Sequence, residues 1–446
     1  METLKRRGFI KKSMVVSAGL AIGAPAYIKG FVQTKPSDII NVAVVGVHSQ
    51  GGFAMSNFTK IKDTRVVAIC DCVETLLPAA SAAIEKLGGA KPKTVVDYRD
   101  LLTDKGIDVI SIATPGYWHA LMTIAACQAG KDVYCEKPLA YTIEEGRKVV
   151  QAARKYNRIV QIGTQNRSNR IKQKAIQLIH EGVIGEVYMG RGIVFDHRGS
   201  IGRTENIPIP KGTNWDLLRG PAPMIPFSNN HYLYNWHWYW DTSTSEFGNN
   251  GIHMMDLVRW GMNKNEHPTK IACCGGFYAY DSDQEIPNLE VATFEYADGS
   301  MMELEVRSLF TNYEQGGSKD CFFYGSKGWM HIGNGFEIYL GTKKEPESVM
   351  TSKDLEPDEY DKLGIDHHFV NFIGAIRSRK YQDLIADVEG GHMSTAIMHL
   401  GNIAYRTDRK LTFDGKTERF VNDNDANTYL TRKDGYRKPY VLPEKI

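Results

Sequence analysis

The segment Ile39–Gly52, which reads IINVAVVGVHSQGG, decides the fold of the first part of the chain. Its apolar, β-branched run lacks polar alternation, which is typical of a parallel strand covered by helices on both faces. The run enters a turn bounded by glycines, and the residues from Phe53 to Ile61 can form a helix after it. Strand, turn and helix in this order predict the first βα unit of a doubly wound sheet.

The turn after this strand has glycine where a phosphate-binding turn needs it. Gly46 and Gly51 stand at the first and third glycine positions of a GxGxxG pattern, and His48 replaces the middle glycine. Glycine lets the chain turn sharply and lets backbone N–H groups approach a pyrophosphate at the start of the helix. Asp71 ends the next predicted strand, where a carboxylate binds the adenosine ribose and repels a 2′-phosphate. These four residues therefore predict binding of NAD rather than NADP, the alternative being a turn glycine and a capping aspartate.

Strand and helix patterns alternate from this point onward. We expect strands at Val66–Cys70, Thr94–Tyr98, Asp108–Pro115 and Asp132–Pro138, and helices at Thr75–Gly88, Asp100–Gly106 and His119–Gly130. This alternation predicts an α/β fold that begins with a Rossmann doubly wound parallel sheet, over residues 36–160.

The charge of the chain argues against a nucleic-acid partner. Its 446 residues include 54 Lys and Arg and 52 Asp and Glu, a net charge of +2. Nucleic-acid binding needs a basic field, since Lys and Arg supply affinity by releasing phosphate counterions. The seven cysteines form no CxxC pair and predict neither a disulfide framework nor a zinc site. We expect a globular protein of two or three domains without a metal site.

The N-terminus has the pattern of an export signal. A basic stretch at Lys5–Lys12 precedes an apolar stretch at Ser13–Tyr27, which falls short of the ~20 residues that span a bilayer. The pair Arg6-Arg7 resembles a twin-arginine signal, so we expect residues 1–33 to be signal and linker. The prediction is a periplasmic protein that is exported folded and has no membrane span when mature. A lipid-facing or merely basic N-terminus is the alternative.

The run from Ser111 to Ala140 resembles the Gfo/Idh/MocA family of oxidoreductases, which includes glucose-fructose oxidoreductase and inositol dehydrogenase. The resemblance rests on the motifs ATP (Ala113–Pro115), AGK (Ala129–Lys131) and EKPLA (Glu136–Ala140), with His119 between the first two. It implies a C-terminal α+β domain, here residues 161–446, that binds substrate through a large open, mainly antiparallel sheet. It also implies a homo-oligomer, either a dimer or a tetramer.

The second half of the chain fits that expectation by its own pattern. Alternating segments at Ile271–Tyr280, Leu289–Leu309, Asp320–Gly333 and Phe336–Gly341 predict strands and hairpins, with ADGS and GSKG as tight turns. Helices are expected at Arg170–Gly182, Ile252–Met262 and Phe369–Ser378.

The resemblance implies roles for residues in and around the EKP motif, Glu136–Pro138. It makes Lys137 the catalytic lysine that binds the reacting oxygen, where an ammonium also favours a developing alkoxide. Cofactor contacts are expected from Thr114, Pro115, His119, Glu136 and Lys137. The alternative for Lys137 is a solvated surface lysine.

A DxGxH pattern supplies a carboxylate and a histidine in the family, and here Asn249, Gly251 and His253 match it. An amide cannot accept a proton at neutral pH, so His253 is the predicted general base and Asn249 a substrate ligand. Asp256, one helical turn later, is a further substrate-binding candidate that either orients the imidazole or caps the local structure. A satisfied core histidine is the alternative for His253.

The stretch Tyr234–Asp241, YNWHWYWD, is unusually aromatic. Aromatic faces stack on sugar rings but also fill cores, and an extended segment would place Trp236 and Trp238 on one face. We take Trp236 as a substrate-binding candidate, with Arg167, Tyr98 and His392 as weaker ones. Surface salt bridging is the alternative for Arg167, and strand packing is the alternative for Tyr98. The pair His367-His368 is expected to begin a helix, and His237, Glu246, His253 and Asp256 have no recognised metal-ligand spacing.

Three functions remain open at this stage. The first is a periplasmic NAD-dependent oxidoreductase that acts on a sugar or glycoside, with a tightly bound cofactor that is recycled because the periplasm has no nicotinamide pool. The second is an NAD-dependent glycosidase that works by transient ring oxidation and elimination. The third is a non-catalytic sugar-binding protein with an inert cofactor, which Asn249 and His48 favour.

Overall fold

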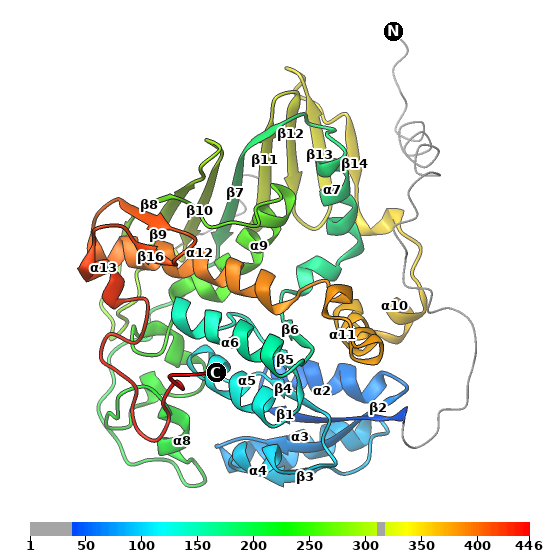
Figure 1. Cartoon of the computed structure of the whole chain (residues 1–446), viewed down its shortest axis with the longest axis vertical. Helices are drawn as coiled ribbons and strands as arrows, with labels where there is room; N and C mark the ends of the chain where they lie inside the picture. The colour runs from blue at the N-terminus through cyan, green and yellow to red at the C-terminus, as the bar shows by residue number, and fades with distance from the viewer. Residues whose placement is uncertain (1–37, 310–316) are drawn as a thin grey trace.

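A computed structural model describes residues 38–309 and 317–446 (Figure 1). The described chain builds two β-sheets, one near the bottom and one near the top of Figure 1, with helices packed between them. The predicted export signal, residues 1–33, lies outside the described residues. Among those residues no helix is both long enough and apolar enough to cross a membrane.

The first sheet has six strands, and every pair of neighbours is parallel. Its strand order β3-β2-β1-β4-β5-β6 is doubly wound, which confirms the predicted Rossmann architecture. The strands are β1 (Ile40–Val45), β2 (Thr64–Cys70), β3 (Lys93–Val95), β4 (Val109–Ile112), β5 (Asp132–Cys135) and β6 (Val160–Ile162).

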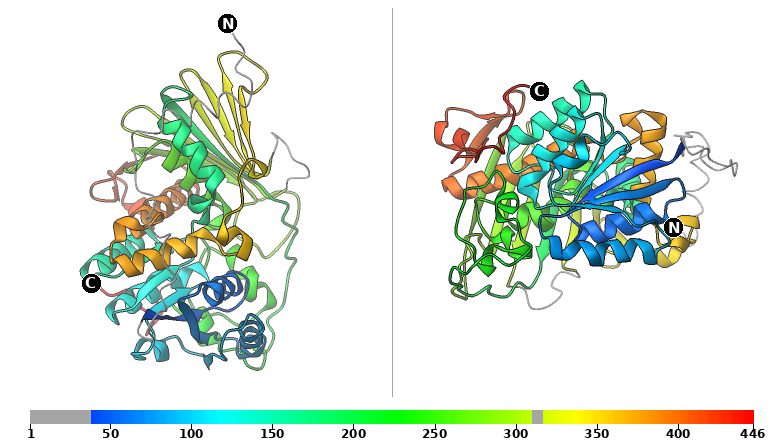
Figure 2. Two further views of the ribbon diagram at one scale, coloured as in Figure 1. Left: turned by 90° about the vertical axis from the view of Figure 1, so that its right-hand side faces the viewer. Right: turned by 90° about the horizontal axis from the view of Figure 1, so that it is seen from below.

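Helices cover both faces of this sheet, as the view from below in Figure 2 shows. Val42 and Val44 of β1 belong to the core on one face, and Ala43 and Val45 belong to the core on the other. A strand buried on both faces needs apolar residues at every position, which explains the unbroken apolar run in the sequence. The helices are α2 (Gln50–Lys60), α3 (Leu77–Lys86), α4 (Arg99–Leu102), α5 (His119–Gln128) and α6 (Ile143–Lys155).

A helix from the C-terminal part of the chain, α11 (His367–Ser378), completes one of these cores. Phe369 stacks on Tyr134, with ring centroids 4.6 Å apart, and meets Phe58 edge-on at 5.0 Å. The first sheet is therefore stabilised by residues far beyond β6. The domain boundary expected near residue 160 stays a prediction.

The second sheet has ten strands in the order β14-β13-β12-β11-β7-β10-β9-β8-β15-β16. Only β7 and β10 pair in parallel within the part that the structure describes, so the prediction of a mainly antiparallel sheet is confirmed. The strands are β7 (Val187–Phe195), β8 (Lys270–Gly276), β9 (Leu289–Glu295), β10 (Met301–Arg307), β11 (Lys319–Gly325), β12 (Gly328–Ile332), β13 (Phe336–Leu340), β14 (Ser348–Met350), β15 (Leu411–Asp414) and β16 (Arg419–Phe420).

One face of this sheet packs on α7 (Arg170–His180), α9 (Ile252–Gly261) and the long α12 (Val388–Thr407). Residues of β10 alternate as predicted, because Met302, Leu304 and Val306 are buried while their neighbours are half-exposed. Helix α12 also lies against α6, as Figure 1 shows, and so joins the two halves of the molecule. Shorter helices are α8 (Trp215–Arg219), α10 (Glu359–Leu363) and α13 (Asn424–Thr428).

Candidate active site

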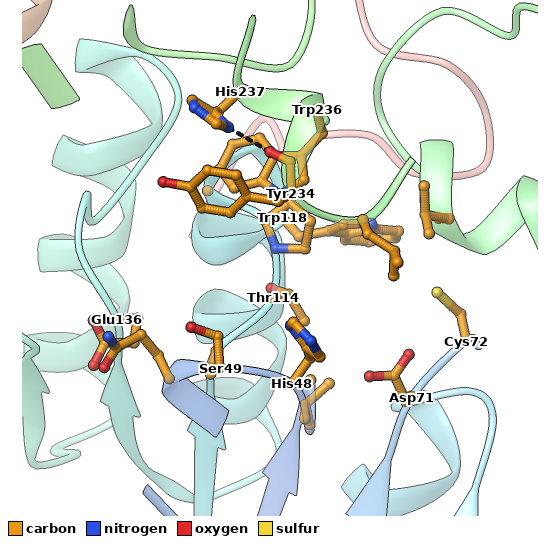
Figure 3. Close-up of a pocket in the computed structure, with 18 of the residues that line it drawn as sticks. His48, Ser49, Asp71, Cys72, Thr114, Trp118, Glu136, Tyr234, Trp236 and His237 are labelled. Carbon is orange, nitrogen blue, oxygen red and sulfur yellow. Dashed lines mark hydrogen bonds between the residues drawn. The ribbon is translucent and has the colours of Figure 1, made fainter. Parts of the chain in front are cut away.

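A pocket lies at the carboxyl ends of β1, β2, β4 and β5. Gly46, Asp71, Thr114 and Lys137 line it from the first sheet, and residues between Leu217 and Asn249 form the opposite wall. Figure 3 shows this arrangement, with Asp71 and His48 near the strands and Trp236 and His237 across from them. Open α/β sheets bind their ligands at this place, outside the carboxyl ends of the strands.

The backbone of the first turn admits only glycine at its two key positions. Gly46 has φ +82°, and a Cβ there would lie 2.6 Å from the Ala113 carbonyl oxygen. A Cβ on Gly51 would lie 1.8 Å from the Gly46 carbonyl oxygen. His48 is exposed and lines the pocket, while the positive φ that follows falls on Ser49, at 48°. The turn keeps the close backbone approach that a pyrophosphate needs.

Asp71 is fixed by the backbone on either side of it. Its Oδ2 accepts from the Val47 N–H at 3.0 Å, and its Oδ1 accepts from the Val73 N–H at 2.9 Å. Burial raises the pKa of this carboxyl group, while both N–H groups oppose that rise. The carboxylate lines the pocket beside Cys72, where an adenosine ribose would be bound and a 2′-phosphate would be repelled.

His119 lies behind the pocket wall and not on it. Its Nδ1 is 2.6 Å from the Pro138 carbonyl oxygen, and its Nε2 is 2.8 Å from the Thr114 carbonyl oxygen. Burial lowers the pKa of the imidazole to about 4. Thr114 and Pro115 do line the pocket. The neutral imidazole has a single N–H and donates to one of these two carbonyl oxygens, and His119 packs between the loop after β4 and the EKP loop.

Glu136 lines the pocket and is almost fully buried. Its Oε1 accepts a hydrogen bond of 2.8 Å from Gln165 Nε2, and burial raises its pKa to about 7. A Cβ on Gly163 would lie 2.7 Å from the carboxylate, so the glycine makes room for it. Gln165 was not predicted as a site residue, although it stands two positions after Gly163.

Lys137 meets the DxGxH-like segment across the pocket. Its Nζ donates to the Asn249 carbonyl oxygen at 2.6 Å and lies 3.4 Å from Asn249 Oδ1. Asn249 Nδ2 in turn donates to Glu246 Oε1 at 3.0 Å, and Asn250 Nδ2 donates to Glu246 Oε2 at 3.0 Å. Burial lowers the pKa of Lys137. A buried carboxylate, Glu246, thus lies behind Asn249 and does not itself line the pocket.

His253 follows at the start of α9. Its Nδ1 is buried without a hydrogen-bond partner, and burial together with the Lys137 ammonium lowers its pKa to about 3. The imidazole is therefore neutral and keeps a lone pair. Of the residues Asn249–His253, only Asn249 lines the pocket. Asn249 belongs to the π-helical turn Phe247–Gly251 (η8), which ends two residues before His253, and such turns are frequent at functional sites.

Arg167 and Asp256, both predicted to bind substrate, bind each other. Arg167 Nε and Nη2 donate to the two Asp256 oxygens at 2.6 and 2.9 Å, and Ser394 Oγ donates to Asp256 at 2.6 Å. Neither residue lines the pocket. The pair joins the segment before α7 to α9, and His253 Nδ1 receives no contact from Asp256. Their predicted contact with substrate stays a prediction.

The aromatic stretch differs from the extended form that the sequence analysis considered. Leu233–Trp238 (η7) forms a 3₁₀-helix, so Trp236 and Trp238 do not share a face. Trp236 lines the pocket and meets Tyr117 edge-on at 6.0 Å, whereas Trp238 is buried with Tyr239 and Ile286. Tyr98 lines the pocket as well.

The suggestion that His392 returns to this site is wrong. His392 Nε2 lies 2.7 Å from Glu418 Oε1, and His267 Nε2 lies 2.8 Å from the same atom. The pair His367-His368 does begin a helix, α11, with Asp366 as its cap. Among the described residues, groups close enough to share a metal ion are His267, His392 and Glu418, and Asp358, Asp361 and His367; neither group lines the pocket.

A segment beyond the first sheet, Gly212–Leu218, forms hydrogen bonds at the nucleotide end of the pocket, and it was not predicted. We call this segment the strap. Glu74 N–H donates to the Gly212 carbonyl oxygen and Asn214 N–H donates to that of Cys72, both at 2.8 Å. Tyr117 Oη donates to the Leu218 carbonyl oxygen at 2.6 Å. Leu217 and Leu218 line the pocket. No motif marks the segment, because backbone groups make most of these contacts.

Family models match both halves of the chain. One, described as the oxidoreductase family with an NAD-binding Rossmann fold, matches residues 40–164. The other, described as the C-terminal alpha/beta domain of the oxidoreductase family, matches residues 187–442.

Curated proteins of similar sequence carry a hydrolase name. Glycosyl hydrolase family 109 protein 2 of Shewanella sp. (strain ANA-3) is 32% identical over 208 residues, which are 43% of this chain and 46% of that protein. A glycosyl hydrolase family 109 protein of Shewanella putrefaciens is 30% identical over 210 residues, with the same coverage. The chain spans about half the length of these relatives.

Solved structures of similar fold include three oxidoreductases. The WlbA dehydrogenase from Bordetella pertussis, in complex with NADH and UDP-GlcNAcA, has a TM-score of 0.62 at 21% identity and covers 84% of this chain and 99% of its own. Levoglucosan dehydrogenase in complex with NADH and levoglucosan scores 0.63 at 17% identity over 86% and 99%. The aldose-aldose oxidoreductase from Caulobacter crescentus scores 0.61 at 18% identity over 84% and 100%. At these identities the similarity establishes a shared fold.

Proposed function

The chain belongs to the Gfo/Idh/MocA family of oxidoreductases and binds NAD through its Rossmann sheet, and from this premise we propose that it acts on a hydroxyl or ketone of a sugar or glycoside. The observation that carries the proposal is one pocket that joins the glycine cradle to Lys137 and Asn249. The cradle fits a dinucleotide, because the glycine turn, the start of α2 at Gln50, and Asp71 line the same pocket. The turn stays tight because a Cβ at Gly46 or Gly51 would lie within 2.6 Å of a backbone carbonyl oxygen. Asp71 then holds the adenosine ribose.

The side chains at the other end of the pocket suit proton handling. When bound, NAD supplies an acceptor for the hydride of a carbinol carbon. Lys137 donates to the substrate oxygen and stabilises the charge that develops on it. His253, neutral because of its lowered pKa, removes the hydroxyl proton. Asn249 orients the lysine through its carbonyl oxygen, and Trp236 offers an apolar face to a sugar ring.

The strap at Gly212–Leu218 supports a cofactor that remains bound. Its hydrogen bonds to Cys72, Glu74 and Tyr117 hold it beside Asp71, at the end of the pocket where the ribose would bind. A retained cofactor must return its hydride to a second carbonyl compound or to the same molecule. This behaviour suits a protein exported folded to the periplasm, as the pattern of residues 1–33 predicts. A dimer or tetramer stays a prediction.

The second candidate is a glycosidase that reduces the same cofactor transiently and reoxidises it in each turnover. The relatives named glycosyl hydrolase family 109 favour it. In that reaction a ring hydroxyl is oxidised transiently and the aglycone departs by elimination. The intact EKP motif and the contact between Lys137 and Asn249 would serve the oxidation step in both the oxidoreductase and the glycosidase reaction.

The test begins with the full chain as purified. Mass spectrometry of a denatured sample should find stoichiometric NAD without added cofactor. Incubation with a panel of glycosides then distinguishes the candidates: a keto-sugar indicates the oxidoreductase, and a freed aglycone without net redox change indicates the glycosidase. A protein that binds nicotinamide weakly, or that alters no glycoside, contradicts the proposal.

A further inference from the structure

One imidazole in the pocket has a free lone pair and no role in the proposed reaction. His237 is 3% exposed, and its Nδ1 contacts the Tyr234 carbonyl oxygen, as the dashed line in Figure 3 marks. A carbonyl oxygen only accepts, so Nδ1 carries the proton and Nε2 carries the lone pair. His237 Nε2 is buried without a hydrogen-bond partner, and burial keeps the ring neutral by lowering its pKa to about 4.

The surroundings of this lone pair contain a second acceptor. Glu246 Oε1 lies 3.9 Å from His237 Nε2, beyond hydrogen-bond reach, and is 3.3 Å from Arg198 Nη2. Glu246 is 1% exposed and linked to Lys137 through Asn249. His237 lines the pocket on the wall opposite His48 and Asp71. Lys137 and His237 line the same pocket, so the lone pair of His237 belongs to the site that holds the ligand of Lys137.

We propose that His237 Nε2 accepts a hydrogen bond from a second hydroxyl of the substrate, beside the carbon that is oxidised, so that the pocket selects a free diol. The inference rests on the proposed function, since Lys137 and His253 there serve the reacting oxygen. A buried acceptor without a partner costs free energy that a hydroxyl donor recovers. An analogue that lacks this hydroxyl leaves the lone pair unsatisfied, and such sites reject the analogue strongly.

The test compares a reactive glycoside with its deoxyfluoro analogues at the carbons next to the oxidised one. Fluorine keeps the size of the hydroxyl but cannot donate. Single-turnover reduction of the bound NAD in the full-chain holoenzyme should slow by roughly 10–100-fold for one analogue. In His237→Leu the ratio between parent and analogue should fall below about threefold, and in His237→Gln, which keeps an acceptor oxygen, it should lie in between. His231→Leu, an imidazole deletion on the same segment outside the pocket, should keep the wild-type ratio.

Four results would overturn the inference. The wild-type enzyme could fail to discriminate among the analogues. The ratio could be unchanged in His237→Leu. The variant could release NAD with the ratio intact, which would assign the imidazole to the cofactor. It could also slow parent and analogue equally by more than about 100-fold, the worth of a general base. A holoenzyme that no sugar reduces overturns the proposed function, and this inference with it.

Discussion

The two ends of the pocket are built in different ways. At the nucleotide end the backbone sets the shape, through Gly46 and Gly51, and Asp71 is held by two N–H groups. At the reacting end, side chains from separate segments meet, and buried atoms of His237 and His253 lack partners. The first end is organised before any ligand arrives. At the second, His237 Nε2 and His253 Nδ1 are left without a partner among the described residues, as a site for proton transfer requires.

The largest effect is expected at the nucleotide end, from Gly51→Ala. The new Cβ would lie 1.8 Å from the Gly46 carbonyl oxygen, so the turn must move. We expect loss of retained NAD and destabilisation by about 1–3 kcal/mol or more, measured by mass spectrometry and denaturant unfolding. Gly52→Ala is the matched control, because its Cβ meets only the Val47 carbonyl oxygen at 3.8 Å. Equal behaviour of the two variants would contradict a backbone-built cradle.

The next largest effect, on the rate of hydride transfer, is expected at Lys137, at the reacting end of the pocket. Lys137→Ala should slow hydride transfer by ~10²–10⁴ and weaken substrate binding, while NAD stays in place. Asn249→Ala, which keeps the carbonyl oxygen that the lysine contacts, should raise KM more than it lowers kcat. Steady-state kinetics on a reactive glycoside gives both values. A Lys137→Ala variant with wild-type kcat would show that the lysine is structural.

Cofactor preference should respond more modestly. Replacing Asp71 with Ser and Cys72 with Arg removes the repulsion of a 2′-phosphate and adds a partner for it. We expect a shift toward NADP of roughly tenfold, about 1.4 kcal/mol, less the cost of two hydrogen bonds to backbone N–H groups. Reloading the apo protein with each nucleotide measures the ratio. A wild-type protein that already prefers NADP would contradict the role given to Asp71.

The smallest effect is expected in the pH dependence of thermal stability, at a buried glutamate of the second sheet. Glu290 of β9 is fully buried, and burial raises its pKa to about 8 from the 4.5 of an exposed glutamate. Between those values the folded state holds a proton that the unfolded state has released, so stability falls as pH rises through that window. Glu290→Gln should therefore melt a few degrees above wild type at pH 9 and close to it at pH 5. The exposed Glu186→Gln is the control, and a gap that stays constant with pH would contradict this reading.

The same contrast explains how far the sequence could predict the molecule. The first sheet, the glycine turn and Asp71 depend on local patterns, and the six-stranded parallel sheet is confirmed. Strand β7, at the centre of the second sheet, and helix α12, buried along most of its length, carry no clear periodicity and were missed. His237 and the strap reach the pocket only through tertiary packing. Trp236 and Trp238 would share a face only in an extended chain, and the 3₁₀ segment breaks that alternation.

The central claim is that substrate reduces a bound cofactor with His253 as base. The direct measurement is single-turnover reduction of the bound NAD by a reactive glycoside, followed at the nicotinamide absorbance, in wild type and His253→Ala. We predict that the variant retains NAD and reduces it ~10²–10⁴ more slowly. A His253→Ala variant that reduces its cofactor at the wild-type rate, with a substrate deuterium effect showing that chemistry limits that rate, would contradict the account.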